Sequence, residues 1–479
     1  MDRGITSYGV YIPNLRLERS AIAAAHAWAI PSLKGQAKGV RAVPSWDEDS
    51  VTMGVEAARG TDNSKVAQLN FASLTPPFID LQNATLVASG LGLANTVATN
   101  DFGGSVRAGT AALISALRNT AQGDTLVVAA DARLAKPGSV QEMQYGAGAV
   151  ALTVGSEGVL ARLLATAHRS DPFIDHFRAS GDKFDYYWEE RWVRDEGYGK
   201  LVPAAIKAAL AEAGVAADAV KHFVVQSPLS GVAVAVAKKL GVAPEAVIDT
   251  MTARVGDTGT AQGLLMLAAA LERAQPGDKI VVATFGAGVD VLVLEATEAL
   301  SGYKARLSVA AAVNGGRTEA HYMKMLSFQG LVQPDWGMRA ETSEKIALTQ
   351  QYRAREQLYH FVAGKCPCCG QVQFPQLASC VNCGAFEPME QVSLAEEIGT
   401  IASYTADWLQ FNPAPPLYFG LVQFGNGARV LMEMVDVDPA NPIDVGTPLR
   451  MVFRIKSKDN ERHSNRYFWK ATPVAKQGE

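Results

Sequence analysis

The most specific chemical pattern in the chain is a pair of Cys-x2-Cys repeats in its last third. Cys366 and Cys369 form the first pair, and Cys380 and Cys383 form the second, ten residues further on. Four thiolates in two such pairs supply the tetrahedral, soft ligand set that Zn²⁺ prefers. We expect a closed structural zinc site, with a register shifted onto the spare thiol of Cys368 as the alternative. A redox role is disfavoured, because no thioredoxin-like βαβ pattern surrounds the pairs.

A second stretch, NDFGGSVRAGTAAL at residues 100–113, has the form of a nucleophile site without the nucleophile. A Gly-rich turn leads into small residues at a helix start, where the helix dipole favours a thiolate. No cysteine occurs in residues 1–365, however. Ser105 is the hydroxyl that remains, and none of the seven histidines is an obvious base for it. We therefore treat Ser105 as a minor candidate nucleophile.

The elements that must position this stretch are repeated along the chain. Residues 108–132, AGTAALISALRNTAQGDTLVVAADA, resemble residues 258–288, TGTAQGLLMLAAALERAQPGDKIVVATFGAG. Each copy predicts an amphipathic helix, a Gly-Asp turn and a buried β-branched strand. We expect two similar α/β halves, residues 1–155 and 156–325, with coincidence of common turn chemistry as the alternative.

Three further segments differ in composition from these halves. Residues 170–203 are aromatic and charged with little apolar periodicity, which we interpret as an insertion that caps the second half. Residues 326–364 are polar and helix-prone, and predict a connecting helical segment ahead of the zinc ribbon at 365–390. Residues 391–479 contain short strands with Gly, Asn and Pro turns, which predict a small all-β barrel or sandwich.

Composition excludes several classes of protein. With 48% hydrophobic and 19% charged residues the chain can bury a large core, and a net charge of −4 argues against general nucleic-acid binding. No run approaches the roughly 20 apolar residues of a membrane span. The first residues lack the apolar core of a signal peptide, so we expect a cytoplasmic protein with no membrane or nucleic-acid partner.

Several segments, in order over roughly residues 1–300, resemble 3-hydroxy-3-methylglutaryl-CoA (HMG-CoA) synthase-like members of the thiolase superfamily. They are GVYIPNLRL, SWDEDSVTMGVEAA, FGGSVRAGTAAL, FDYYWEERWVRDEGYGKLVP and GDTGTAQGLLMLAAALERAQPGDKIVVATFGAG. The C-terminal part resembles the DUF35-type zinc-ribbon and OB-fold modules that accompany such enzymes. The resemblance implies an α/β fold, a duplicated αβαβα core plus zinc ribbon and OB-fold, a homodimer, and an acyl-CoA substrate. In that family a cysteine at a buried helix N-terminus takes the acyl group.

This sequence departs from the family pattern at each catalytic position. The resemblance places Val106 where the cysteine belongs, Gln226 where a histidine belongs and Asp257 where an asparagine belongs. Gln226 and Ser227 could hydrogen-bond a thioester oxygen, with a satisfied strand end as the alternative. Asp257 is our candidate general base, although Asp is also favoured as a helix N-cap. Val106 is expected to line the acyl site.

The cap supplies the other candidates, because it combines carboxylate, phenol and cation as an active site requires. Tyr187 and Glu189 are candidate proton-transfer groups. Arg191 and Arg194 are candidate ligands of the CoA phosphates. Surface ion pairs are the alternative for each of these residues.

We therefore expect an enzyme that cleaves a C–C bond of an acyl-CoA without a Cys nucleophile. The favoured reaction is hydrolytic retro-Claisen cleavage of a β-ketoacyl-CoA to a carboxylic acid and acetyl-CoA. The alternatives are a retro-aldol lyase acting on a β-hydroxyacyl-CoA, an HMG-CoA synthase-like acyltransferase, and a non-catalytic acyl-CoA-binding scaffold. The cofactors expected are structural zinc and the coenzyme A of the substrate.

Overall fold

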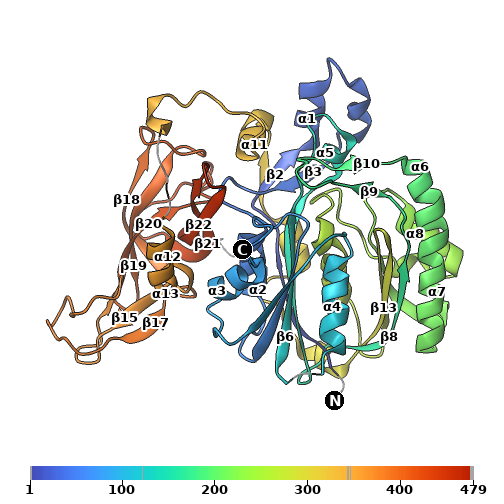
Figure 1. The fold of residues 1–479 in the computed structure, drawn as a ribbon, viewed down its shortest axis with the longest axis horizontal. Coiled ribbons are helices and arrows are strands. Elements are labelled where there is room, and N and C mark those ends of the chain that lie inside the picture. The colour runs from blue at the N-terminus through green and yellow to red at the C-terminus, as the bar shows by residue number, and fades with distance from the viewer. Residues whose placement is uncertain (1–2, 121, 342–344, 346, 475–479) are drawn as a thin grey trace. The chain divides into compact units, whose positions relative to one another are not determined.

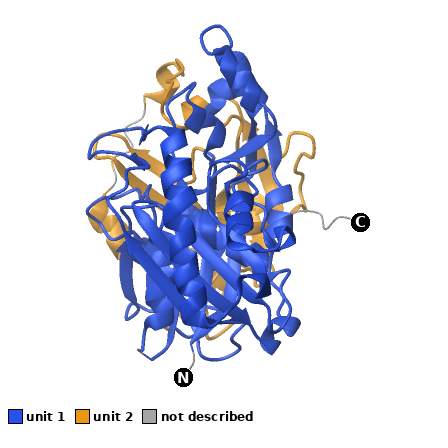
Figure 2. Ribbon diagram, turned by 90° about the vertical axis from the view of Figure 1, so that its right-hand side faces the viewer, with its two compact units in different colours: residues 1–45, 49–88, 93–325 blue, residues 46–48, 89–92, 326–479 orange. Residues whose placement is uncertain are grey.

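The computed structural model describes residues 3–120, 122–341, 345 and 347–474. The chain divides into two compact units, coloured separately in Figure 2: residues 1–45, 49–88 and 93–325, and residues 46–48, 89–92 and 326–479. Parts of the expected domains lie outside the described residues, namely 1–2, 121, 342–344, 346 and 475–479.

A nine-stranded mixed sheet forms the core of the first unit, in the order β11-β12-β13-β8-β1-β7-β6-β4-β5. One half contains β1 (Gly4–Tyr11), β4 (Val66–Ala72), β5 (Ala98–Phe102), β6 (Asp124–Ala132) and β7 (Ala147–Gly155). The other contains β8 (Ala161–Ser170), β11 (Val220–Val225), β12 (Lys279–Phe285) and β13 (Gly288–Ala296). The halves join where β1 and β8 pair through two residues each. The central strands are buried along almost their whole length and are mostly apolar, because helices cover both of their faces.

Two helices from the repeated segments lie between the halves (Figure 1). They are α4 (Ala108–Arg118) and α9 (Gln262–Leu271), which contact each other. A Cβ on Gly109 would lie 2.2 Å from the backbone oxygen of Thr260, so glycine is what lets the two helix starts approach. The outer layers are α2 (Ser50–Ala58), packed on β6 and β7, and α7 (Val202–Ala213), packed on β8 and β13. The result is the αβαβα arrangement that the family resemblance implied, built from the two similar halves that the repeat predicted.

The smaller elements of this unit lie around these layers. A three-stranded sheet contains β2 (Leu15–Glu18), β3 (Val40–Val43) and β14 (Arg317–Glu319). The remaining helices are α1 (Arg19–His26), α3 (Asn83–Gly90), α5 (Val140–Gln144), α8 (Val232–Leu240), α10 (Val309–Asn314) and α11 (Tyr322–Phe328), the last of which runs into the second unit.

The segment expected to cap the core contains a short hairpin and a helix of unusual geometry. The hairpin pairs β9 (His176–Phe177) with β10 (Tyr186–Tyr187). After α6 (Glu190–Trp192), residues Val193–Leu201 form a π-helix that continues directly into α7. π-Helical turns occur disproportionately at functional sites. A functional site is therefore expected next to this segment.

The second unit contains two β modules. In the first, β15 (Val362–Lys365) pairs with β16 (Val372–Gln373) and β17 (Glu390–Ser393), after α12 (Leu348–Arg353) and α13 (Arg355–Tyr359). The second is a closed barrel of β18 (Gly399–Asp407), β19 (Leu417–Phe424), β20 (Arg429–Met434), β22 (Ser464–Pro473) and β21 (Pro448–Asp459). The expected all-β C-terminal module is confirmed. Among the described residues, no helix has the length and apolar character needed to cross a membrane.

Candidate active site

A cavity of about 190 Å³ opens in the first unit at the carboxyl ends of several strands. Its walls come from the ends of β6, β11 and β12, from the residues before α4 and α9, and from α5, and the cap supplies the rest. Carboxyl ends of neighbouring parallel strands are a common place for ligand sites in α/β folds. One set of lining residues is polar: Arg133, Gln141, Gln144, Asp175, His176, Tyr187, Glu190, Gln226 and Asp257. A second set is largely apolar: Val106, Val140, Trp188, Val193, Tyr198, Pro228, Leu229 and Phe285.

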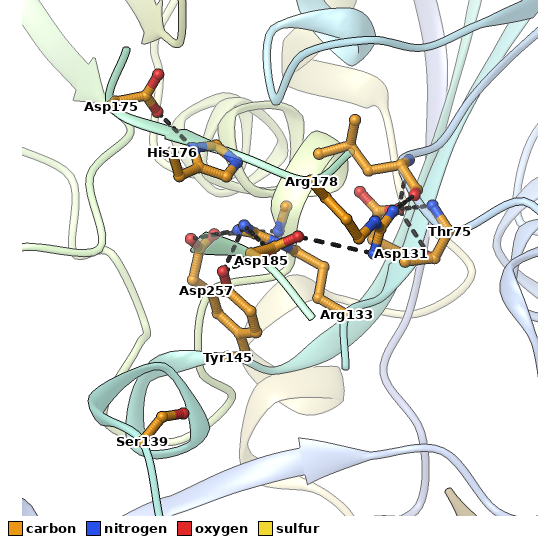
Figure 3. A network of polar contacts seen from close by, with 12 residues as sticks. Thr75, Asp131, Arg133, Ser139, Tyr145, Asp175, His176, Arg178, Asp185 and Asp257 are labelled. Carbon is orange, nitrogen blue, oxygen red and sulfur yellow. Dashed lines mark hydrogen bonds and ion pairs between the residues drawn. The ribbon is translucent and has the colours of Figure 1, made fainter. Parts of the chain in front are cut away.

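Arg133 is the centre of the polar set. Its guanidinium lies 2.8 Å from a carboxylate oxygen of Asp185 in the cap and 3.5 Å from one of Asp257 in the core. It also donates to the hydroxyl of Tyr145 at 2.6 Å and lies 3.9 Å over the ring of Tyr145. Tyr145 in turn donates to Asp185 at 2.7 Å. Figure 3 shows these contacts converging on one buried cation.

The ionisation of this cluster follows from burial and from that cation. Burial alone would lower the pKa of Arg133, but the surrounding acidic groups outweigh it and raise the pKa, so the guanidinium stays charged. Burial raises the pKa of Tyr187 despite the nearby cation, so Tyr187 is a neutral phenol that can donate a hydrogen bond. Burial also raises the pKa of Asp257, against the lowering effect of Arg133. The pKa of Asp185 is lowered, because Arg133 and its hydrogen bonds outweigh desolvation.

Asp257 is fixed by backbone contacts as well as by Arg133. Its N–H donates to the Gln144 carbonyl at 2.7 Å, and its own carbonyl accepts from Gly146 at 2.9 Å. A Cβ on Gly146 would lie 2.0 Å from the backbone oxygen of Val255, so the close approach requires glycine there. One carboxylate oxygen accepts from the Gly259 N–H at 3.0 Å, which closes an Asx turn two residues on. The N-cap positions of the following helical turns are Thr258 and Ala261, so the N-cap role that was the alternative for Asp257 is wrong. Asp257 thus combines a structural contact with a place in the cavity wall.

His176 and Asp175 form a hydrogen-bonded pair in the same wall. The Nδ1 atom of His176 lies 2.6 Å from an Asp175 carboxylate oxygen. In the neutral imidazole this contact assigns the proton to Nδ1 and leaves Nε2 as the acceptor. The ring stacks on Tyr187 with centroids 5.2 Å apart, which holds it beside the Arg133 cluster (Figure 3).

Gln226 carries a buried acceptor without a partner. Its side-chain N–H donates to the Gly259 carbonyl at 2.9 Å, which fixes the orientation of the amide. In the described part of the chain, Oε1 accepts no hydrogen bond, and the residue is only 3% exposed. Leaving such an acceptor unsatisfied costs about 1–3 kcal/mol, so a ligand or water that donates to it is favoured.

The start of α4 presents an apolar side chain to the cavity. Val106 lines the wall two residues before the helix begins. Ser105 is not among the lining residues, and its hydroxyl donates to the Gly286 carbonyl at 2.8 Å. That contact occupies the one O–H of the candidate nucleophile with a backbone acceptor.

The structure brings together Asp257, Tyr187, Gln226 and Val106 from the sequence-based set. It places the remaining candidates outside the residues that line the cavity. Arg191 pairs with Asp195 at exposed positions, and Glu189 is exposed. Arg194 does not line the cavity, but it pairs with Glu190, which does. Ser227 is buried and hydrogen-bonds within its own turn.

Sequence reasoning did not select Arg133, Asp175, His176 or Asp185. The adjacent Asp-His dipeptide in the cap was the one signal available for the histidine pair. Arg133 follows a buried strand with nothing nearby in the sequence to mark it, since its partners come from residues more than 10 and as many as 124 positions away. Only the fold brings these charges together.

The four predicted zinc ligands converge in the second unit. Their sulfur atoms all lie within 4.8 Å of one another, with Cys366 facing Cys383 at 3.7 Å and Cys369 facing Cys380 at 3.5 Å. Cys368 is exposed and is not part of the group. Four thiolates at such spacing fit one tetrahedral Zn²⁺ ion.

Three family models match the chain. They are the C-terminal domain of 3-oxoacyl-(acyl-carrier-protein) synthase III over residues 210–294, the ChsH2 rubredoxin-like zinc ribbon over 353–388, and the ChsH2 C-terminal OB-fold over 392–454. Among solved structures, 3-oxoacyl-(acyl carrier protein) synthase III from Pseudomonas aeruginosa matches with a TM-score of 0.56 at 20% identity, covering 62% of this chain and 99% of that one. PksG, an HMG-CoA synthase from Bacillus subtilis, also gives 0.56, at 17% identity, covering 72% of this chain and 95% of that one.

The fold and the site thus define a thiolase-like α/β protein fused to a zinc ribbon and an OB-fold. Hydroxymethylglutaryl-CoA synthase from Aeropyrum pernix is 31% identical over 309 residues, which cover 62% of this chain and 86% of that protein. The enzyme of the same name from Methanopyrus kandleri is 30% identical over 296 residues, covering 60% and 84%. The chain belongs to the hydroxymethylglutaryl-CoA synthase family, and that family supports an enzyme of CoA-thioester C–C chemistry.

Proposed function

We propose that the chain hydrolyses a C–C bond of a β-ketoacyl-CoA, giving a carboxylic acid and acetyl-CoA, without an acyl-enzyme. One observation carries this proposal: the Asp175–His176 pair and the buried Arg133 cluster line the same cavity as Val106, at a helix start that offers no thiol. A base and a fixed cation can support attack by water, whereas an acyl-enzyme requires a nucleophile.

Each polar group of the site has a role in moving protons or stabilising charge during this reaction. A water molecule gives its proton to Nε2 of His176, and its oxygen forms a bond to the β-carbonyl carbon. Tyr187 and Arg133 stabilise the resulting alkoxide by hydrogen bonding and charge. When the alkoxide collapses, the bond between the α and β carbons breaks and its electron pair enters the thioester enolate. The imidazolium then protonates that enolate at its α carbon, which releases acetyl-CoA and the acid.

Asp257 is the alternative base for the same step. Its raised pKa makes it a better proton acceptor than an ordinary aspartate. Both of its oxygens already have partners, however, at Gly259 and Arg133. We therefore assign Asp257 to hold Arg133 in place and His176 to take the proton.

A retro-aldol lyase is the second candidate, favoured by the unpaired Oε1 of Gln226. A β-hydroxyl group can donate to this acceptor, whereas a β-ketone cannot. In that reaction the hydroxyl turns its one hydrogen from Oε1 to Nε2 of His176, which takes the proton as the C–C bond breaks and an aldehyde or ketone leaves. The imidazolium then protonates the remaining thioester enolate at its α carbon, which gives acetyl-CoA. In the hydrolytic reaction the attacking water can satisfy the same acceptor.

Product analysis in ¹⁸O-water without free CoA distinguishes the candidates. An aryl and an alkyl β-ketoacyl-CoA are incubated with the full-length protein, and the products are followed by mass spectrometry. A carboxylic acid carrying ¹⁸O together with acetyl-CoA supports hydrolysis. If the β-ketoacyl-CoA compounds are not cleaved but a β-hydroxyacyl-CoA releases an aldehyde or ketone, the protein is a retro-aldol lyase and not a hydrolase. If neither the β-ketoacyl-CoA nor the β-hydroxyacyl-CoA compounds are cleaved, both reactions are rejected and the protein is an acyl-CoA-binding scaffold.

Substitutions then separate the two bases. His176→Gln is expected to lower kcat by roughly 10²–10⁴-fold, the usual contribution of a general base. His222→Gln is the matched control, because His222 also pairs with an aspartate, Asp278 at 3.0 Å, but does not line the cavity. If Asp257→Asn abolishes turnover while His176→Gln leaves it intact, the base is Asp257.

We also propose a structural zinc ion, a homodimer and a cytoplasmic location. The thiolate cluster supports the first, and its need for reduced cysteines supports the last. Strand β5 lies at one edge of the large sheet, and an edge strand can pair with a strand of a second copy. A molar mass of twice 50.9 kDa by light scattering would support the dimer, and a mass of 50.9 kDa would reject it.

A further inference from the structure

Four of the apolar residues that line the cavity pack together. Val193, Tyr198, Leu229 and Phe285 belong to a single cluster of buried side chains. Phe285 packs against Tyr198 with ring centroids 4.9 Å apart, and a Cβ on Gly197 would lie 2.5 Å from the Phe285 ring. The π-helix of the cap is therefore packed tightly on this aromatic wall, and the wall cannot retreat to admit a large group.

Val106 continues this wall at the start of α4. A Cβ on Gly286, the residue after Phe285, would lie 2.7 Å from the Val106 side chain. The polar residues that line the cavity form the other part of its wall, around Arg133 and His176. A substrate whose reacting carbon lies at the polar group thus directs its remaining acyl portion toward the apolar wall.

The size of the cavity limits what that acyl portion can be. An engineered protein cavity of about 150 Å³ lined by Leu, Ile and Phe side chains accommodates benzene. At about 190 Å³ the present cavity is of comparable size, with room for one ring and a few more atoms. Aromatic side chains such as Phe285 and Tyr198 add edge-to-face contacts to a bound aromatic ring.

We propose that the acyl group of the substrate ends in a single aromatic ring, held between Val193, Leu229 and Phe285. This inference rests on the proposed function, since it takes the cavity to be the acyl site of a CoA thioester. It names a class of substrate: β-oxidised arylalkanoyl-CoA thioesters with one ring, rather than short or long straight chains.

Binding of acyl-CoA thioesters that lack a β-oxygen tests the proposal without relying on turnover. Dissociation constants are measured by isothermal titration calorimetry for 3-phenylpropanoyl-CoA, butanoyl-CoA and decanoyl-CoA with the full-length protein. The phenyl compound is expected to bind about tenfold or more tightly than butanoyl-CoA, from the apolar area that it buries. Equal affinities for the three compounds, or tighter binding of decanoyl-CoA than of the phenyl compound, would overturn the proposal.

A pair of matched substitutions tests the location of the ring. Leu229→Ala enlarges the cavity and is expected to improve binding of 3-(2-naphthyl)propanoyl-CoA by about fivefold relative to the phenyl compound. Leu210→Ala is the control, because Leu210 is buried in the same cluster but does not line the cavity. An equal change in both variants would place the ring elsewhere and overturn the assignment. The wild-type series decides the substrate class even if neither variant folds.

The two proposals fail in different ways. If 3-phenylpropanoyl-CoA binds selectively but no β-ketoacyl-CoA or β-hydroxyacyl-CoA is cleaved, the reaction is rejected and the ring preference stands. If cleavage occurs with equal kcat/KM for acetoacetyl-CoA, 3-oxodecanoyl-CoA and benzoylacetyl-CoA, the reaction stands and the ring preference is rejected.

Discussion

Asp185, in the cap, lies 2.8 Å from the guanidinium of Arg133, in the core, and both side chains are almost completely buried. This ion pair joins the hairpin of the cap to the end of β6, and Arg178 adds a second contact to Asp185 at 3.7 Å. The cap therefore supplies the carboxylate that pairs with the buried guanidinium of Arg133 in the core. Figure 3 shows Asp185 between the two arginines.

Removing this carboxylate should loosen the cap and impair activity together. Asp185→Asn leaves Arg133 with Asp257 alone, at 3.5 Å, and breaking a buried pair costs about 3–5 kcal/mol. We expect a lower free energy of unfolding in urea and faster hydrogen exchange over residues 175–190. Asp195→Asn, which breaks an exposed pair with Arg191, should change stability by no more than about 0.5 kcal/mol.

Because folding lowers the pKa of Asp185, the contribution of this carboxylate to the free energy of unfolding depends on pH. A carboxylate whose pKa is depressed by folding stabilises the protein above its unfolded pKa, and this stabilisation is lost as pH falls through the folded value. The stability difference between the wild type and Asp185→Asn should therefore shrink on acidification below about pH 4. A difference that grows at low pH would contradict the ion-pair assignment.

Glu319, in the small sheet, should behave in the same way over a defined pH range. Burial raises its pKa, but hydrogen bonds from Lys324 and His321 lower it more, to about 2. Glu319→Gln should destabilise the protein by about 1 kcal/mol at pH 7, after allowance for the solvent exposure of its partners. That loss should disappear as pH falls from about 4.5 to about 2, by urea unfolding at several pH values. The control is Glu298→Gln, at an exposed position.

Gly109→Ala tests the packing of the two repeated helices. The added methyl group would lie 2.2 Å from the Thr260 carbonyl oxygen, so the helix starts must move apart. Overpacking of this kind costs roughly 3 kcal/mol in a well-packed core. Gly35→Ala, where a Cβ would meet nothing within 4 Å, should leave the urea midpoint nearly unchanged. Equal midpoints for the two variants would refute the close approach.

The zinc content of single-cysteine variants distinguishes the four predicted zinc ligands from the fifth cysteine. Cys380→Ser removes one of the four clustered sulfur atoms and should reduce zinc from about one ion per chain toward zero, with a lower melting temperature. Cys368→Ser should leave both values unchanged, because that thiol is outside the cluster. Inductively coupled plasma mass spectrometry of the purified variants measures this. Loss of zinc from Cys368→Ser would show that the shifted register is the true one.

Much of the fold could be inferred from the sequence, for a physical reason. Helix and strand periodicity, Gly-Asp turns and paired cysteines are local patterns, so they are visible in a linear chain. The repeat of residues 108–132 in 258–288 predicted the paired helices α4 and α9, and the spacing of the cysteines singled out the four that converge. The thiolase-like fold and its C-terminal modules are confirmed.

The site could be inferred only in part. Asp257, Gln226 and Val106 were selected because the family resemblance places them at catalytic positions, and Tyr187 because of its neighbours in the cap. The structure places all four in the cavity wall. The exposed cations Arg191 and Arg194 matched the expected composition of a site, but composition does not determine which way a side chain points.

What only the tertiary structure decided is the placement of charge. Arg133 is joined to Asp185 and Asp257 across 52 and 124 residues of sequence. A buried charge must be paired to be tolerated, but the pairing depends on which strands and loops the fold brings together. Sequence alone therefore determined the class of fold and the absence of cysteine from residues 1–365. The structure decided that Arg133 and the histidine–aspartate pair line one cavity.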